Sequence, residues 1–194
     1  MIRKTKYGHG EPAWADYSAF DAARAKTFYC ELFGWTAEDR NTIDGRPYTT
    51  LRKDGNVVCG LVLMSDSMKK KGIRPRWNTF VNVRDAAAVE HSTVQHGGRS
   101  IITTKQIATT WLNLLADPRG ATFATWQTPE PYGADVIGEA RSYWGSVLMT
   151  SDLDSSASFY GDVLAWSYEE HPGDLRSVRE ARQPSAYVRR VDEG

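Results

Sequence analysis

Asp16 is the residue of this chain whose setting most favours acid–base chemistry. It lies in the stretch Trp14–Phe20, "WADYSAF", whose aromatic and small side chains are typical of a buried strand. A carboxylate buried there is costly without a partner, and burial raises its pKa towards the range useful to a general base. Arg24, Arg46 and Arg52 are candidate ion-pair partners. The alternative is structural, with Asp16 capping a neighbouring strand.

Thiol and imidazole groups are weaker candidates. The two cysteines form no Cys-x-x-Cys motif, and strand alternation turns Cys59 towards the helices, which predicts an inert buried thiol. The histidines are scattered, and two of them, five residues apart, would lie on different faces of one helix. We predict surface or capping roles for all four: His9, His91, His96 and His171.

Charge and composition exclude several classes of protein. Lys plus Arg equals Asp plus Glu, at 24 each, so the basic excess of a nucleic-acid binder is missing. The one basic run, Lys69–Arg76, is interpreted as a solvated linker rather than an anion site. The longest apolar run, Val57–Met64, is too short for a bilayer, and the N-terminal residues lack the apolar core of a secretory signal. The sequence therefore predicts a cytoplasmic protein that binds neither nucleic acid nor membrane.

An internal repeat gives the organisation of the chain. The stretch "FYCELFGW" (Phe28–Trp35) returns as "FYGDVLAW" (Phe159–Trp166), 131 positions later (159 − 28). A second period of 64 relates Asp21 to Asp85 (85 − 21). Each such aspartate, with Asp152, suits a helix start because its carboxylate accepts the free N–H groups there. Three helices are therefore expected to begin at these positions.

Strand-like runs precede and follow these helices. One β-branched or aromatic run comes before each helix, and three follow the first and the second. We expect strand, helix and three strands in residues 11–65 and again in 75–128. The third copy starts near Tyr143 and has only 28 residues after Trp166 (194 − 166), eleven of them charged, which predicts an incomplete module.

These βαβββ units, with "FYCELFGW" closing a helix and "LLADPRGATFATWQ" forming the last hairpin, resemble the vicinal oxygen chelate superfamily. That group includes glyoxalase I, bleomycin-resistance proteins and extradiol dioxygenases; within it the chain looks most like tandem actinobacterial proteins labelled hydroxylase or glyoxalase-like, which carry four modules. The resemblance implies an α+β fold of tandem modules that form a paired, curved mixed sheet around a cavity. The expected division is a paired domain (1–130), a linker (131–142) and a truncated third module (143–194).

The resemblance also places the metal ligands of the superfamily. Counting from the helix-opening aspartates and the last hairpin puts Trp14, Gly60, Asn78 and Ala124 at those positions. None is a good ligand for a divalent ion, although Asn78 could offer one weak carbonyl oxygen. We therefore predict no metal and no other cofactor.

Strand alternation then sorts side chains into the cavity. Gly60 and Ala124 are expected to leave room, between flat apolar rings and a few hydrogen-bonding groups. The predicted ligand-binding residues are Trp14, Asp16, Ser18, Gly60, Asn78, Phe80, Asn82, Thr122, Ala124 and Trp126. In the alternative interpretation, the two tryptophans only fill the interior of the sheet.

Three hypotheses follow. The first is a protein that binds a small apolar or aromatic molecule without a metal, with Asp16 as the candidate catalytic residue. The second is a metal-dependent lyase or dioxygenase, which needs ligands not found here. The third is a role in assembly, in which the third module joins two copies into a homodimer because its half-pair would otherwise expose apolar sheet.

Overall fold

The computed structural model describes residues 4, 6–42, 45–129, 133–179 and 186–192. The first module contains β1 (Glu11–Ala19), α1 (Ala22–Phe33), β2 (Thr36–Asn41), β3 (Pro47–Lys53) and β4 (Asn56–Leu63). After a short helix, α2 (Asp66–Lys70), the second contains β5 (Arg76–Asn82), α3 (Ala86–Gln95), β6 (Arg99–Ile107), β7 (Thr110–Ala116) and β8 (Thr122–Gln127). The third contains β9 (Ser146–Thr150), α4 (Leu153–Leu164), β10 (Tyr168–His171), β11 (Leu175–Val178) and β12 (Ala186–Arg190).

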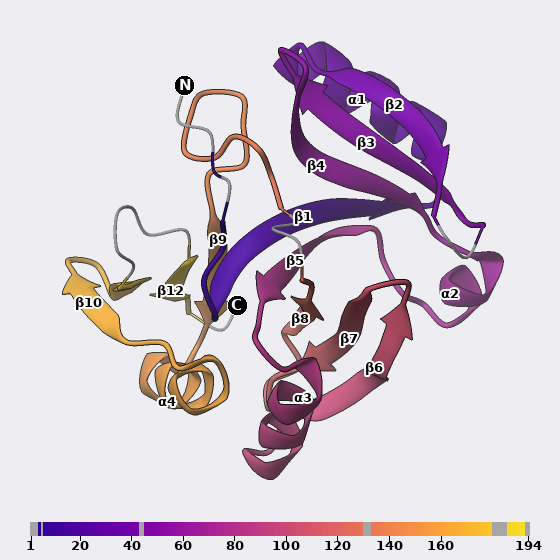
Figure 1. Cartoon of the computed structure of the whole chain (residues 1–194). Coiled ribbons are helices and arrows are strands. Elements are labelled where there is room, and N and C mark those ends of the chain that lie inside the picture. The colour runs from indigo at the N-terminus through magenta and orange to yellow at the C-terminus, as the bar shows by residue number, and fades with distance from the viewer. Residues whose placement is uncertain (1–3, 5, 43–44, 130–132, 180–185, 193–194) are drawn as a thin grey trace.

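The first two modules form one curved sheet of eight strands. Its order is β2-β3-β4-β1-β5-β8-β7-β6, and the modules join where β1 pairs antiparallel with β5 (Figure 1). Within each module the first strand runs parallel to the last, β1 with β4 and β5 with β8. The predicted paired mixed sheet and the α+β class are therefore confirmed.

The helix-opening aspartates behave as the sequence predicts. The carboxylates of Asp21, Asp85 and Asp152 accept hydrogen bonds from the backbone N–H three residues on, at 2.9, 2.9 and 3.0 Å. Such N-caps satisfy donors that have no partner inside the helix. The ends of α1 and α4 also match, because Gly34 and Ala165 both adopt the left-handed conformation, with φ of 65° and 59°.

The third module is more complete than the sequence predicts. Three strands follow α4, and the sheet order β10-β11-β12-β9 with parallel β12 and β9 repeats the arrangement of the first module. The prediction of an incomplete module is wrong because these strands have only four or five residues each, too few for a clear alternating pattern. Residues 180–185 of this region lie outside the described residues.

The second module contacts both of the others. Figure 1 places the first module at the upper right, the second below it and the third at the left. Helix α4 packs beside α3, and its Phe159, Tyr160 and Val163 join one buried cluster with Val81 and Phe123 of the second module. The Tyr160 hydroxyl also donates to Asp117 Oδ2 at 3.2 Å. Helix α1 packs on the eight-stranded sheet through a separate cluster that includes Leu51 and Cys59.

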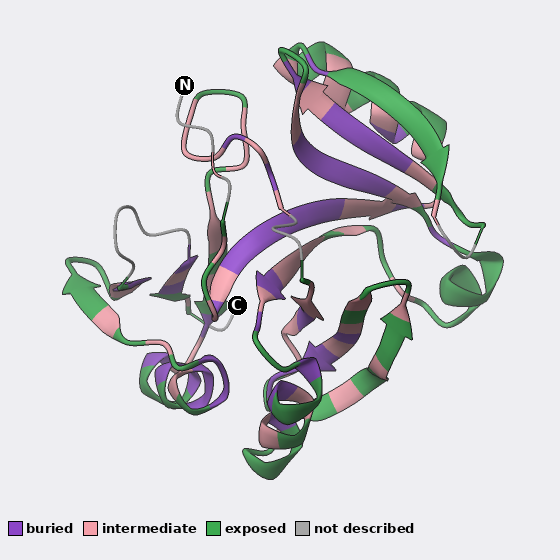
Figure 2. Ribbon diagram, viewed as in Figure 1, coloured by how far each residue is buried: buried purple, intermediate pink, exposed green. Residues whose placement is uncertain are grey.

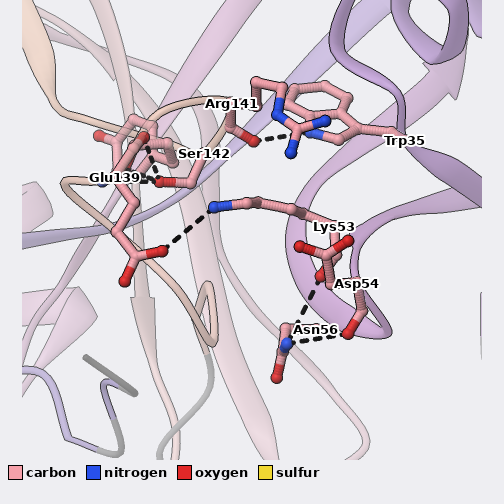
Figure 3. Close-up of polar contacts among 8 residues, drawn as sticks. Trp35, Lys53, Asp54, Asn56, Glu139, Arg141 and Ser142 are labelled. Carbon is pink, nitrogen blue, oxygen red and sulfur yellow. Dashed lines mark hydrogen bonds and ion pairs between the residues drawn. The ribbon is translucent and has the colours of Figure 1, made fainter. Parts of the chain in front are cut away.

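The predicted linker packs closely against the first module in its described part, residues 133–142. Ala134 and Val136 are fully buried, and the Ala134 N–H donates to the carbonyl of Ala13 at 2.9 Å. Figure 3 shows the Trp35 indole donating to the Arg141 carbonyl at 2.8 Å and Lys53 Nζ pairing with Glu139 at 3.1 Å. This segment is therefore part of the folded structure rather than a solvated tether; residues 131–132 lie outside the described residues.

The segment from Tyr7 to Gly10 is held by the second and third modules. Asn82 Nδ2 donates to the carbonyls of Tyr7 and Gly8 at 2.8 and 3.0 Å. The Trp166 indole of the third module donates to the carbonyl of Gly10 at 2.6 Å. Trp35 and Trp166, equivalent in the repeat, thus both bind a backbone carbonyl far away in the sequence.

The basic run Lys69–Arg76 is largely exposed as expected, but Lys69 and Lys70 belong to α2, which the sequence analysis did not predict, and the half-buried Arg76 begins β5. Across the described residues, no helix has the length and apolar character needed to cross a membrane.

Candidate functional site

The candidate site lies on the face of the eight-stranded sheet opposite the helices, here called the helix-free face. Directly paired residues in a ladder point to the same side of a sheet. The register pairs Asp16 with both Gly60 and Asn78, Trp14 with Phe80, and Phe80 with Ala124. The sequence therefore identified a set of side chains that share one face. Their binding of a ligand stays a prediction.

Aromatic side chains fill one end of this face. Trp14 and Trp126 stack with centroids 6.3 Å apart, and Phe80 lies 5.3 Å from Trp126. The Trp14 indole donates to Tyr48 Oη at 2.9 Å. Trp14 is buried while Phe80 and Trp126 are half-buried, so this end is a packed apolar surface with two partly accessible rings.

Gly60 does not leave the space that the sequence analysis assigned to it. The Tyr48 hydroxyl lies against Gly60, at the place that a Cβ would take. The expectation of an open corner is therefore wrong because a neighbouring strand fills it, and Tyr48 is the site residue that sequence reasoning missed. The absence of a side chain at Gly60 was the signal, since it lets the Tyr48 ring lie over Gly60 on the same face of the sheet.

The polar end of the helix-free face is built around Asp16. Asn78 Nδ2 donates to Asp16 Oδ1 at 2.7 Å and to Ser18 Oγ at 2.8 Å. The side-chain oxygen of Asn78 accepts from Arg76 Nε at 3.2 Å. These contacts join Asp16, Ser18 and Asn78, three predicted site residues, into one network, and add Arg76 to it.

Asp16 is a buried carboxylate, only 5% exposed. Burial raises its pKa from 3.8 to about 6, against a smaller lowering by the Asn78 hydrogen bond. Within the described part of the chain, no ion pair reaches Asp16, and Arg52, one of the expected partners, instead binds Glu38 at 2.7 Å. The nearest cation in the network is Arg76, which contacts Asp16 only through Asn78.

Two neighbouring acidic groups are held neutral. Burial, followed by the negative charge of Asp16, raises the pKa of the Tyr48 hydroxyl and of the Cys59 thiol. Cys59 is buried in the cluster beneath α1, as its alternation predicted. The Tyr48 oxygen accepts the hydrogen bond from Trp14. The hydroxyl proton of Tyr48 is not used in that bond.

Two predicted binding residues have other contacts. The Asn82 amide holds the N-terminal segment through its two bonds to backbone carbonyls. Thr122 lies at the beginning of β8 and lines a cavity of about 100 Å³ between the second and third modules, together with Val147 and Trp166. A larger groove of about 440 Å³ lies on the helix side, between α1 and the β2–β3 hairpin, where Lys26 pairs with Asp39.

The side chains of the helix-free face do not fit a divalent metal ion. The counted ligand positions hold an indole, a glycine, an amide and a methyl group, and Asp16 supplies the one carboxylate beside them. Zinc and iron sites take several His, Cys or carboxylate ligands. Among the described residues, no three His, Cys, Asp or Glu side chains come together to hold a metal.

The comparisons with known proteins agree with this architecture. Residues 15–125 match the family model described as a glyoxalase-like domain, so the chain belongs to the glyoxalase-like family. "Putative glyoxylase CFP32" of Mycobacterium tuberculosis is 29% identical over 170 residues, 87% of this chain and 65% of that protein. "Anthracycline biosynthesis protein DauV" of Streptomyces sp. (strain C5) is 29% identical over 171 residues, 82% of this chain and 62% of that protein. The chain thus spans less than two thirds of the length of these relatives.

Solved structures support the fold. A Mn(II)-bound glyoxalase from Novosphingobium aromaticivorans superposes with a TM-score of 0.68 at 16% identity, covering 94% of this chain and 62% of that one. The 2,2',3-trihydroxybiphenyl 1,2-dioxygenase of Sphingomonas wittichii gives 0.64 at 16% identity, covering 97% and 68%. At this identity the likeness shows the vicinal oxygen chelate fold alone.

Proposed function

We propose that this chain binds a small apolar or aromatic molecule against the helix-free face of its first two modules, without a metal ion. The buried carboxylate of Asp16 is the observation that carries the proposal. A carboxylate with a raised pKa and no direct cationic partner is costly for folding, and such groups gather at functional sites. It lies where an amide, a hydroxyl and a phenol converge beside accessible aromatic rings.

The rings favour a flat, apolar ligand. Phe80 and Trp126 are half-buried, and both present π surfaces that can stack against an aromatic molecule at the edge of the Trp14 cluster. The name of one group of relatives, which places them in anthracycline biosynthesis, points to the same ligand class.

Asp16 would orient that ligand. With a pKa of about 6 it is largely ionised at neutral pH, so it can accept a hydrogen bond from a ligand hydroxyl, or a proton from an acidic carbon or phenol. The Tyr48 hydroxyl, held neutral by burial, is a donor for a ligand oxygen. This pairing of one acceptor with one donor gives a polar end to an otherwise apolar surface.

Binding is tested with the purified chain and a panel of mono- and polycyclic aromatic compounds that includes an anthracycline. We expect quenching of tryptophan fluorescence and a rise in melting temperature without added metal. Asp16→Asn should weaken binding at least tenfold, whereas Asp162→Asn, a change at an exposed carboxylate on α4, should leave it unchanged. Equal binding by Asp16→Asn and the unmodified chain would remove Asp16 from the site.

Metal content separates this proposal from the alternative of a metal-dependent lyase or dioxygenase. We expect elemental analysis of the purified chain to give far less than one zinc, iron, nickel or manganese per chain. A stoichiometric metal, lost together with ligand binding on chelation, would overturn the proposal and favour the alternative.

A further inference from the structure

Arg76, the last residue of the basic run, differs from the exposed cations that precede it. It is half-buried, and its pairing with Ser18 places it on the helix-free face of the sheet. Its Nε donates to the side-chain oxygen of Asn78 at 3.2 Å. Within the described residues, Nη1 and Nη2 of Arg76 have no hydrogen-bond or ion-pair partner. The guanidinium therefore keeps one edge, with both Nη groups, for a further acceptor.

The bond from Arg76 also determines the orientation of the Asn78 amide. Because the Asn78 oxygen accepts from Arg76, the amide NH2 points the other way, where it donates to Asp16 Oδ1 at 2.7 Å and to Ser18 Oγ at 2.8 Å. Both N–H groups of the amide are then used. Among the described residues, the Ser18 hydroxyl proton and Asp16 Oδ2 remain without a partner.

These groups lie in two neighbouring rows that run across the strands. Arg76 pairs with Ser18 in one row, and Asn78 pairs with Asp16 in the next. The first row offers donors, from the guanidinium edge and the hydroxyl, whereas Asp16 in the second row offers an acceptor. A molecule that satisfies both rows must present an acceptor to Arg76 and Ser18, and a donor to Asp16.

A planar carboxylate is the acceptor that best fits one guanidinium edge. Two parallel N–H groups match its two oxygens, and bonds between charged partners are stronger than a bond to a neutral carbonyl. A phosphate would bring up to two negative charges to a single available cation. Arg40, at the other end of the same row, already lies 3.6 Å from Glu38. The charges of the row therefore favour a monoanion.

The distance from Arg76 to the aromatic rings limits the size of the ligand. Arg76 and Phe80 lie on the same face of β5, and the guanidinium leans towards Asn78. Asn78 and Phe80 are two residues apart, a gap of about 7 Å along the strand. A single ring stacked on Phe80 with a carboxylate attached directly falls short of Arg76. Fused rings in line with the carboxylate reach it.

We propose that the ligand of the helix-free face is a fused-ring aromatic monocarboxylic acid. Its carboxylate binds the Nη edge of Arg76 and the Ser18 hydroxyl, while its rings stack on Phe80 and Trp126. This inference rests on the proposed function, because it names the chemical class of the molecule that binds at the same site. Arg76 then selects for the charge of the ligand, and Asp16 faces a hydroxyl or other donor group on its rings.

Two matched probes test the charge selection: anthraquinone-2-carboxylate and its methyl ester. We expect the unmodified chain to bind the acid about tenfold more tightly than the ester at neutral pH and low salt, as one charge-assisted contact allows. Arg76→Gln should bind the two probes equally, and Arg76→Lys should keep part of the preference. Arg84→Gln removes the same charge at an exposed position just beyond the other end of β5, so it should keep the full preference.

The ratio of the two dissociation constants separates ligand recognition from a structural role of Arg76. If Arg76 served only to hold the Asn78 amide, Arg76→Gln would weaken both probes alike and the preference for the acid would persist, which would overturn the inference. Equal binding of acid and ester by the unmodified chain would overturn the inference and leave the proposed function standing. Failure of both probes to bind would overturn the two together.

Phe80→Leu tests the position of the rings, because it keeps an apolar side chain of similar volume but removes the flat surface. We expect it to weaken the acid and the ester alike, by about three- to tenfold, and to leave the preference for the acid unchanged. Unchanged affinity in Phe80→Leu would contradict the stacking of the ligand on this residue.

Discussion

The first and third modules have the same order of elements but contact the second module through different ones: the first through its strand β1 and the third through its helix α4. The first module joins it edge to edge through β1 and β5, while the outer side of α1 meets solvent. The third packs its helix against the second, so α4 is buried while the β9 face is exposed (Figure 2). One local sequence pattern therefore serves in two environments, and only the tertiary contacts distinguish them.

The repeated motif shows this difference residue by residue. Phe28 of α1 is 55% exposed, while the equivalent Phe159 of α4 is 5% exposed. Both helices begin at an aspartate and end at a residue in the left-handed conformation. The motif determines where the helix begins and ends. The burial of the helix depends on what packs against the helix.

The largest effect should come from the buried phenylalanine. Phe159→Ala should lower the free energy of unfolding by about 3–5 kcal/mol, because it leaves a cavity between the second and third modules. Phe28→Ala should cost about 0.5 kcal/mol or less, as expected for an exposed side chain. Chemical denaturation of both variants measures the difference, and equal losses would contradict the comparison.

The second comparison concerns the position five residues before the helix aspartate, Asp16 in the first module and Val147 in the third. The folded protein binds the Asp16 proton more tightly than the unfolded chain does, so this contribution to stability is fully present below pH 3.8 and is lost as pH rises through about 6. The shift corresponds to about 3 kcal/mol. Asp16→Asn should remove this part of the pH dependence of the free energy of unfolding.

The control places a carboxylate at the exposed equivalent position. Val147→Asp should leave the difference in unfolding free energy between pH 4 and pH 6.5 the same as in the unmodified chain, because an exposed carboxylate keeps an ordinary pKa. If Asp16→Asn had the same pH dependence of the unfolding free energy as the unmodified chain, the raised pKa of Asp16 would be contradicted.

The smallest effect should come from the helix ends. Gly34→Ala should destabilise the protein by about 1 kcal/mol and Ala165→Gly should stabilise it by up to about 1 kcal/mol, because a Cβ is unfavourable at positive φ. Thermal unfolding of the pair checks the opposite signs. A loss of stability in Ala165→Gly would show that chain entropy outweighs the backbone strain at this site.

Much of the fold and of the shared site face could be predicted from sequence. Asp21, Asp85 and Asp152 locate the helices by a local interaction, and a fixed repeat then carries the strand phase from one module to the next. The approach of Tyr48 to Gly60 could not be predicted, because it depends on the register of β3 against β4. The bonds of Asn82 to the N-terminal segment were missed because they join residues about 75 positions apart.

The hydrogen bond from Trp166 to Gly10 has a consequence for synthesis of the protein. Its two residues are 156 positions apart, so on a ribosome adding roughly 5–20 residues per second the indole emerges on the order of ten to thirty seconds after its acceptor. During that interval the nascent N-terminal segment lacks this anchor, even if the first two modules have already formed. The segment around Gly10 therefore gains this bond only after Trp166 of the third module has been synthesised.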